Sequence, residues 1–158
     1  MRLVLCMLCA GIMLTGFVLV SNAQNQNPKP GEVMYVTPQE AVELTSNLTD
    51  HAGTHFLVRK DSYGQELVYR DASGVPEVHR DWADHFVVLE GAATLVIGGT
   101  VMGEKDTGPG EKRGTSITGG KSYALAPGTN ITVPPNTPHW TILKPGDHFR
   151  AVVFKLKD

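Results

Sequence analysis

The stretch EVHRDWADHFVVLEG (residues 77–91) carries the pattern that decides the fold. A short apolar start, a polar turn and a longer apolar run are typical of two successive β-strands. Residues two apart on a strand face the same side, so Glu77 and His79 are expected to offer an oxygen and a nitrogen to one point. The turn, expected at Arg80–Ala83, resets this alternation, and Asp84 is then expected to face the same way.

A second informative stretch is GTNITVPPNTPH (residues 128–139). Its prolines fix the backbone and cannot donate hydrogen bonds to a sheet, which predicts a rigid turn after the apolar residues. His139 follows this turn directly. A histidine held by a rigid turn beside apolar strands is suited to serve as a metal ligand or a base.

Short apolar runs separated by Gly, Pro, Asn and Asp continue on both sides of these two stretches. Many short strands without βαβ alternation predict an all-β antiparallel sandwich or barrel. The expected strands are Phe56–Lys60, Gln65–Arg70, Glu77–His79, His85–Leu89, Thr94–Ile97, Ser122–Leu125, Ile131–Val133, Trp140–Leu143 and Phe149–Leu156.

Two segments depart from the strand pattern. Thr37-Pro38-Gln39-Glu40 has a capping threonine, a proline suited to the first helical position and a glutamate three residues after the threonine, which predicts one short helix from about Pro38 to Ser46. The segment Gly103–Lys121 is rich in glycine and charge and has no apolar stripe. We expect a long loop there, either functional or mobile.

The composition narrows the function. The chain has 158 residues, 41% of them hydrophobic and 19% charged, which suits one globular domain. The net charge is -2 and no basic face is evident, so nucleic acid is not an expected partner. Phosphate-binding, nucleotide-binding and serine-hydrolase motifs and the HExxH zinc motif are all absent from the sequence.

The N-terminus resembles an export signal. Arg2 precedes an apolar run, and Ser21-Asn22-Ala23 places small residues where a signal peptidase reads, so residues 1–23 are expected to be a signal peptide. An uncleaved membrane anchor is the alternative. Cleavage would remove both cysteines and leave a flexible leader (24–36) and one domain (37–158). The expected location is periplasmic or extracellular, with no membrane contact after cleavage.

The two quoted stretches resemble the paired motifs of the cupin superfamily. In the first motif, G(X)5HXH(X)3,4E(X)6G, His79 matches the second histidine, Asp84 the acid and Gly91 the final glycine, while Glu77 stands at the first histidine position. In the second, G(X)5PXG(X)2H(X)3N, the matching residues are Gly128, Pro134 and His139; Asn136 and Leu143 depart from it.

This resemblance implies a double-stranded β-helix, or jelly-roll barrel, with a short N-terminal helix. It implies one divalent metal ion (Fe, Mn, Ni or Zn) held by His79, Asp84 and His139, with Glu77 as a fourth ligand. For that, the two histidines must lie within about 8 Å of each other. It also implies a small-molecule ligand and a homodimer. As an enzyme, the protein would be a lyase, isomerase or oxygenase acting on a small polar or carbohydrate-like compound, with Glu77 or His139 as base.

Several alternatives remain open on sequence grounds. The acid and the two histidines would also suit a hydrogen-bonded polar patch in a metal-free barrel that binds a sugar or another small ligand without catalysis. A purely structural barrel with a filled interior is a third reading. His85 is an alternative ligand if no turn precedes Asp84, and Trp82 and Trp140 are candidates for the wall of a pocket.

Overall fold

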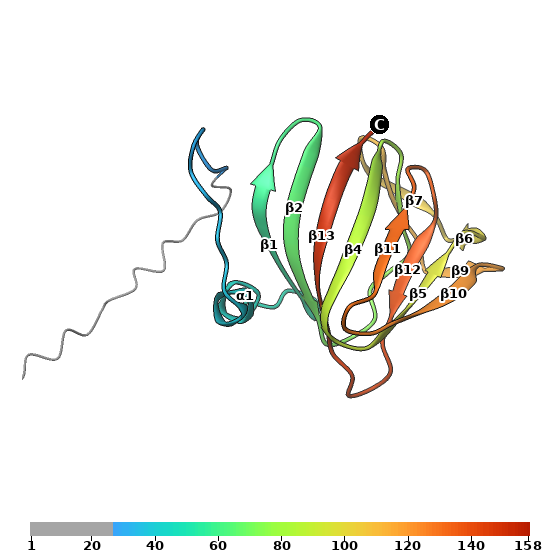
Figure 1. The fold of residues 1–158 in the computed structure, drawn as a ribbon. Helices are drawn as coiled ribbons and strands as arrows, with labels where there is room; N and C mark the ends of the chain where they lie inside the picture. Colours follow the sequence, from blue (N-terminus) through green and yellow to red (C-terminus); the bar gives the residue numbers. More distant parts are fainter. Residues whose placement is uncertain (1–26) are drawn as a thin grey trace, which may run out of the picture.

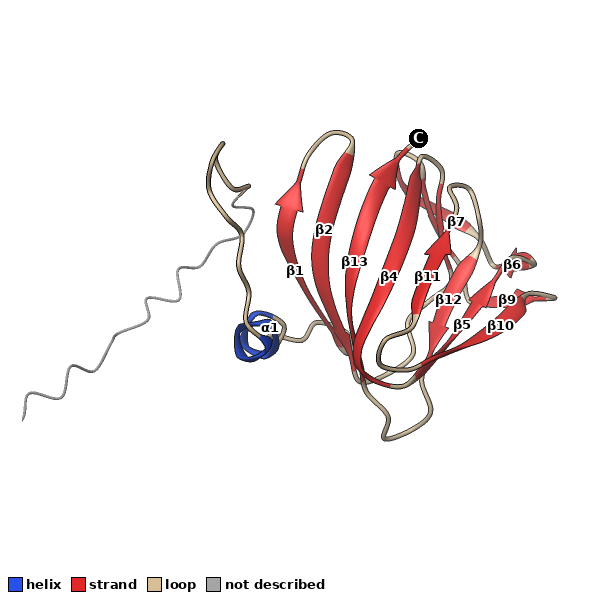
Figure 2. Cartoon of the chain, in the orientation of Figure 1, coloured by secondary structure: helices blue, strands red, loops and turns tan. Residues whose placement is uncertain are grey.

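The computed structural model describes residues 27–158, and within them the chain is built almost entirely of β-strands (Figures 1 and 2). One helix precedes the strands. The elements are α1 (Pro38–Leu44), β1 (Ala52–Arg59), β2 (Tyr63–Arg70), β3 (Glu77–His79), β4 (Trp82–Gly91), β5 (Ala93–Ile97), β6 (Thr100–Met102), β7 (Lys105–Gly108), β8 (Glu111–Arg113), β9 (Ser116–Thr118), β10 (Lys121–Leu125), β11 (Asn130–Val133), β12 (His139–Ile142) and β13 (Phe149–Lys157).

Two antiparallel sheets face each other and form the body of the domain (Figure 1). The first has the order β1-β2-β13-β4-β11 and the second the order β10-β5-β12-β3-β8-β7, while β6 and β9 form a separate two-stranded sheet. Apart from β1-β2 and β7-β8, neighbouring strands in both sheets are not consecutive in the chain, which is the crossing pattern of a jelly roll. The predicted all-β barrel with a short N-terminal helix is confirmed.

The helix begins where its capping residues predict. Thr37 accepts a hydrogen bond from the Glu40 amide at 3.2 Å, and the Glu40 carboxylate accepts one from the Thr37 amide at 2.8 Å. The helix ends at Leu44, two residues earlier than expected. Ala41 is buried with Leu57, Val58 and Leu67, so the helix packs on the outer face of the first sheet.

The space between the sheets is packed at one end only. A buried apolar cluster joins residues of both sheets and includes Leu95 and Ala151, each with no exposed surface. Its members are Val68, Phe86, Val88, Leu95, Leu125, Val133, Leu143, Phe149, Ala151 and Val153. Four of them, Val68, Phe86, Phe149 and Val153, also border a cavity of about 430 Å³. The barrel is therefore not filled, and the filled-barrel reading is wrong.

The expected long loop at Gly103–Lys121 is also wrong. Three short strands, β7, β8 and β9, lie within it, and β8 joins the second sheet by pairing with β3. These strands are only three or four residues long and mostly polar. Backbone hydrogen bonds to neighbouring strands hold them in place, and they have no alternating apolar pattern that would predict a strand from the sequence. The turn expected at Arg80–Ala83 is shorter, because β4 already begins at Trp82.

The other expected strands are found, with ends that shift by a few residues. The proposed signal peptide lies outside the described residues, and the division into leader and domain stays a prediction. Between residues 27 and 158, no helix is long and apolar enough to cross a membrane.

Candidate metal and ligand site

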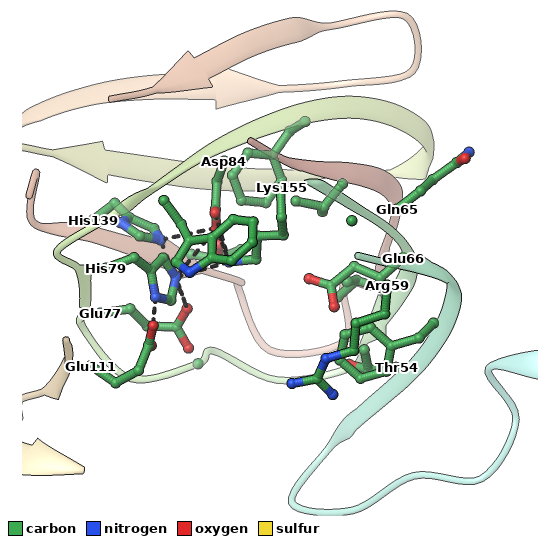
Figure 3. Close-up of a pocket in the computed structure, with 18 of the residues that line it drawn as sticks. Thr54, Arg59, Gln65, Glu66, Glu77, His79, Asp84, Glu111, His139 and Lys155 are labelled. Atoms are coloured by element: carbon green, nitrogen blue, oxygen red, sulfur yellow. Dashed lines mark hydrogen bonds and ion pairs between the residues drawn. The ribbon is translucent and has the colours of Figure 1, made fainter. Parts of the chain in front are cut away.

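Strand register brings the predicted site residues together from both sheets. In the second sheet, Glu77 of β3 pairs directly with His139 of β12, and His79 follows two residues after Glu77 on the same face. In the facing sheet, Asp84 of β4 pairs directly with Lys155 of β13. The site is therefore two cross-strand pairs that meet across the interior of the barrel (Figure 3).

Each of the two histidines lies close to both predicted carboxylate ligands. The His79 Nε2 atom lies 3.5 Å from Glu77 Oε2 and 3.4 Å from Asp84 Oδ2. The His139 Nε2 atom lies 3.7 Å and 3.6 Å from the same two oxygens. Ligand atoms at about 2.1 Å from a tetrahedral ion are about 3.4 Å apart, so these separations suit coordination. The two histidine ring centres are 5.1 Å apart, well within the limit that the resemblance requires.

The hydrogen bonds of both imidazoles direct a lone pair into the site. His139 Nδ1 lies 3.1 Å from the Thr137 carbonyl oxygen, which can only accept, so Nδ1 carries the hydrogen. His79 Nδ1 donates likewise to Glu111 Oε2 at 2.6 Å. In each neutral ring Nε2 then keeps its lone pair. His139 Nε2 is buried and has no hydrogen-bond partner among the described residues, as expected of an atom placed to bind a metal ion.

A second layer of charged residues comes from β8, within the segment expected to be a loop. Glu111 pairs in register with His79, and Arg113 pairs in register with Glu77. The Arg113 Nε atom lies 3.5 Å from Glu77 Oε1 and its terminal nitrogen 3.3 Å from Glu111 Oε2. These contacts hold Glu77 and His79 in place, which is what residues around a metal site do in proteins.

Lys155 is a residue at this site that the sequence interpretation missed. Its Nζ atom lies 2.7 Å from Asp84 Oδ2, 2.6 Å from Asp84 Oδ1 and 3.0 Å from His79 Nε2. Only the contact with Oδ2 has hydrogen-bond geometry at the carboxylate. Asp84 is thus the counter-ion of Lys155, and the remaining three residues, Glu77, His79 and His139, form the candidate metal-binding group.

The pKa values of Glu77, Asp84 and His79 are all shifted in the direction that favours the charged form of the side chain. Burial raises the pKa of Glu77, but hydrogen bonding to His79 and the charge of Arg113 outweigh burial and lower it to about 2. Burial likewise opposes ionisation of Asp84, and its two histidine neighbours and Lys155 overcome this and lower its pKa. Burial lowers the pKa of His79, but Asp84 and Glu77 raise it to about 9. With this pKa the His79 ring is protonated at neutral pH, so a proton, a hydrogen of the Lys155 ammonium and a metal ion compete for the same Nε2 lone pair.

The cavity extends from this cluster to a second ionisable group, Glu66, on β2. Glu66 is 9% exposed and faces the interior from the first sheet, beside Arg59 on the side of the cavity away from the histidines (Figure 3). Burial raises its pKa to about 7, while Lys155 works in the opposite direction. The carboxyl group therefore holds its proton for part of the time near neutral pH, so it can donate or accept a hydrogen bond within the cavity.

Glu66→Gln is expected to stabilise the protein at pH 8 by about 2–3 kcal/mol. The folded-state pKa is raised from 4.5 to about 7, so the wild type loses stability as pH rises through this window. Glutamine removes that loss, and the gain should shrink towards pH 5. Urea unfolding at both pH values, with a chelator present, measures it. Glu43→Gln, on the exposed face of α1, is the control. A gain of equal size at pH 5 and pH 8 would contradict the burial argument.

The remaining predicted residues lie at the edges of the site or away from it. Trp82 borders the cavity, whereas Trp140 donates its indole hydrogen to the Gly74 carbonyl at 2.7 Å. His85 contacts Thr132 and lies against Phe154, so it is not a ligand of this cluster. The sequence interpretation did not identify Lys155 of β13 or Glu66 of β2 as site residues. Each is a charged residue next to an apolar residue on the inward face of its strand.

Comparison with known proteins supports the architecture at the level of the fold. No protein-family model matches the chain, and no curated protein sequence matches it. Solved structures do. A conserved protein with a double-stranded β-helix domain from Klebsiella pneumoniae has 13% identity and a TM-score of 0.57, over 80% of this chain and 91% of that one.

Two further structures are similar. The cupin domain of Cnp3 from Schizosaccharomyces pombe has 12% identity and a TM-score of 0.53, over 71% of this chain and 69% of that one. KdgF from a Halomonas species has 15% identity and a TM-score of 0.50, over 71% of this chain and 85% of that one. With two facing antiparallel sheets and histidines directed into the space between them, the chain has the double-stranded β-helix fold of the cupin superfamily.

Proposed function

We propose that the protein binds one divalent metal ion through Glu77, His79 and His139 and holds a small polar molecule beside it in the cavity. The observation that carries the proposal is the convergence of two imidazole Nε2 atoms and one carboxylate in the barrel, with His139 Nε2 lacking any partner within residues 27–158. Two imidazoles and a carboxylate suit Fe(II), Mn(II), Ni(II) or Zn(II).

The chain's own residues would give the cavity its selectivity. When bound, a divalent ion supplies a Lewis acid that polarises an oxygen of the ligand. Glu66, across the cavity, would donate a hydrogen bond to the ligand when protonated and accept one when ionised. Phe86, Val153 and Trp82 supply an apolar border. A lyase, isomerase or oxygenase reaction is the enzymatic form of this proposal.

The roles of Glu77 and His139 depend on whether a metal ion is present. If both are ligands, their lone pairs are engaged and the base must come from elsewhere, with Glu66 as the available group. A second candidate function is metal-free binding of a small ligand, without catalysis. The position of Lys155 favours it, since this ammonium already neutralises Asp84 and contacts His79. In that form Glu77 and His139 would meet the ligand directly.

A titration of chelator-treated protein with Ni²⁺ or Zn²⁺ tests the metal proposal. One site per chain is expected by calorimetry, together with a rise in melting temperature, because an ion that binds only the folded state stabilises it. Binding at no stoichiometric site, with no gain in melting temperature, would leave metal-free ligand binding as the function.

Export and a homodimer rest on the sequence and the resemblance, and we propose them on those grounds. Residues 1–23 supply the proposed signal. N-terminal sequencing of exported protein should begin at Gln24; a chain that keeps Met1 and remains with membranes would favour the anchor.

A further inference from the structure

Lys155 occupies an unusual position for a lysine. On β13 the inward-facing residues Phe149, Ala151 and Val153 are buried and apolar, and Lys155 continues the same face at the open end of the barrel. Its side chain is 22% exposed and contacts the candidate metal site, with Nζ between Asp84 and His79 (Figure 3). A buried ammonium is costly unless it is paired, and here both partners belong to the predicted ligand set.

We propose that Lys155 is the resident cation of the metal-free site, and that a divalent metal ion must displace it to bind. This inference rests on the proposed function. When the His79 ring is neutral and its Nδ1 donates to Glu111, its Nε2 atom has one lone pair, which Lys155 approaches to 3.0 Å and which a metal ion would require. The ammonium and the ion cannot both use that lone pair, so the two states exclude each other.

The charges around the site support the same exclusion. Glu77 is held by Arg113 at 3.5 Å, but Lys155 is the cation in contact with Asp84. Without a metal ion, Lys155 offsets that buried negative charge. A divalent ion bound to His79 would lie within a few ångströms of Nζ, where like charges repel strongly in a partly buried site. The flexible lysine side chain would then turn towards the cavity of about 430 Å³.

Lys155 should therefore weaken metal binding in the wild type and control which state is populated. With the metal bound, the released ammonium would face the cavity beside the ion and Glu66. Lys155 is a positioning residue in this account, because it acts on the metal ion through His79 and Asp84.

The test compares Lys155→Met with Lys157→Met in the full chain. Lys157 lies two residues further along β13 and rests against the Trp82 ring, so its replacement removes the same charge without touching Asp84 or His79. Each protein is treated with chelator, its melting temperature is recorded, and it is titrated with Ni²⁺ alone. Lys155→Arg, which keeps the charge, is the conservative variant.

Lys155→Met is expected to melt at a lower temperature than the wild type without metal, because Asp84 loses its counter-ion. It is also expected to bind Ni²⁺ about tenfold or more tightly. Lys157→Met and Lys155→Arg should bind Ni²⁺ within a few-fold of the wild type.

Two results would overturn this inference but leave the proposed metal function standing. One is an unchanged Ni²⁺ affinity in Lys155→Met while wild-type binding still depends on His139. The other is an equal gain in Ni²⁺ affinity in Lys157→Met. No Ni²⁺ binding in any variant, including Lys155→Met, would overturn the proposed metal function and this competition with it. Binding that appears only in Lys155→Met would confirm the displacement and show that the native chain works without metal.

Discussion

Replacing His139 by alanine is expected to lower the affinity for a divalent metal ion about 100-fold or more. In the proposed site His139 would supply one of two nitrogen ligands. Its Nδ1 hydrogen is held by the Thr137 carbonyl, and its Nε2 atom has no hydrogen-bond partner in the described part of the chain. No other histidine is placed to substitute for it. Calorimetric titration with Ni²⁺ or Zn²⁺ measures the loss.

The matched control for this prediction is His85→Ala. His85 is on β4, next to Asp84, but contacts Thr132 and Phe154 outside the cluster. The His85→Ala variant should therefore bind a divalent metal ion with the same affinity as the wild type. Circular dichroism establishes that both variants are folded. If His139→Ala binds as tightly as the wild type, or if His85→Ala loses the same affinity, the ligand assignment is wrong.

Replacing Gly91 by alanine is expected to destabilise the domain by about 3–5 kcal/mol. Gly91 has a φ of +76°, and a Cβ atom there would overlap the His148 carbonyl oxygen and lie 2.7 Å from the carbonyl carbon. Both are backbone atoms of the segment entering β13, so they cannot move without disturbing the pairing of Phe149 with Gly91. Urea unfolding measures the loss.

Gly128→Ala separates backbone strain from the clash. Gly128 has a φ of +86°, but within residues 27–158 no atom beyond its two chain neighbours lies within 4 Å of the position that its Cβ would occupy. Its replacement should cost only about 1 kcal/mol. Equal losses in the two variants would mean that close packing at Gly91 does not contribute.

The sequence was informative wherever a local pattern determines the structure. The capping residues Thr37 and Glu40 predicted the start of the helix, because their hydrogen bonds need only a few neighbouring residues. Alternation along the strand placed Glu77 and His79 on one face. Pairing of Glu77 with His139 is a long-range contact, and here the resemblance to paired cupin motifs supplied what periodicity could not.

The parts that were missed depend on contacts between distant residues. Glu111 and Arg113 lie in a short polar strand whose place is set by pairing with β3, so nothing in its own residues distinguishes it from a loop. Lys155 ends an apolar run, and a charged residue there reads equally well as the exposed end of a strand. Its register opposite Asp84 decides that it points inward.

The most direct test of the account is anomalous diffraction from a crystal of the protein loaded with Ni²⁺ or Zn²⁺. One strong peak per chain is expected inside the barrel, at about 2.0–2.2 Å from the Nε2 atoms of His79 and His139 and from a Glu77 oxygen. A peak elsewhere on the surface, with none between the two histidines, would contradict it.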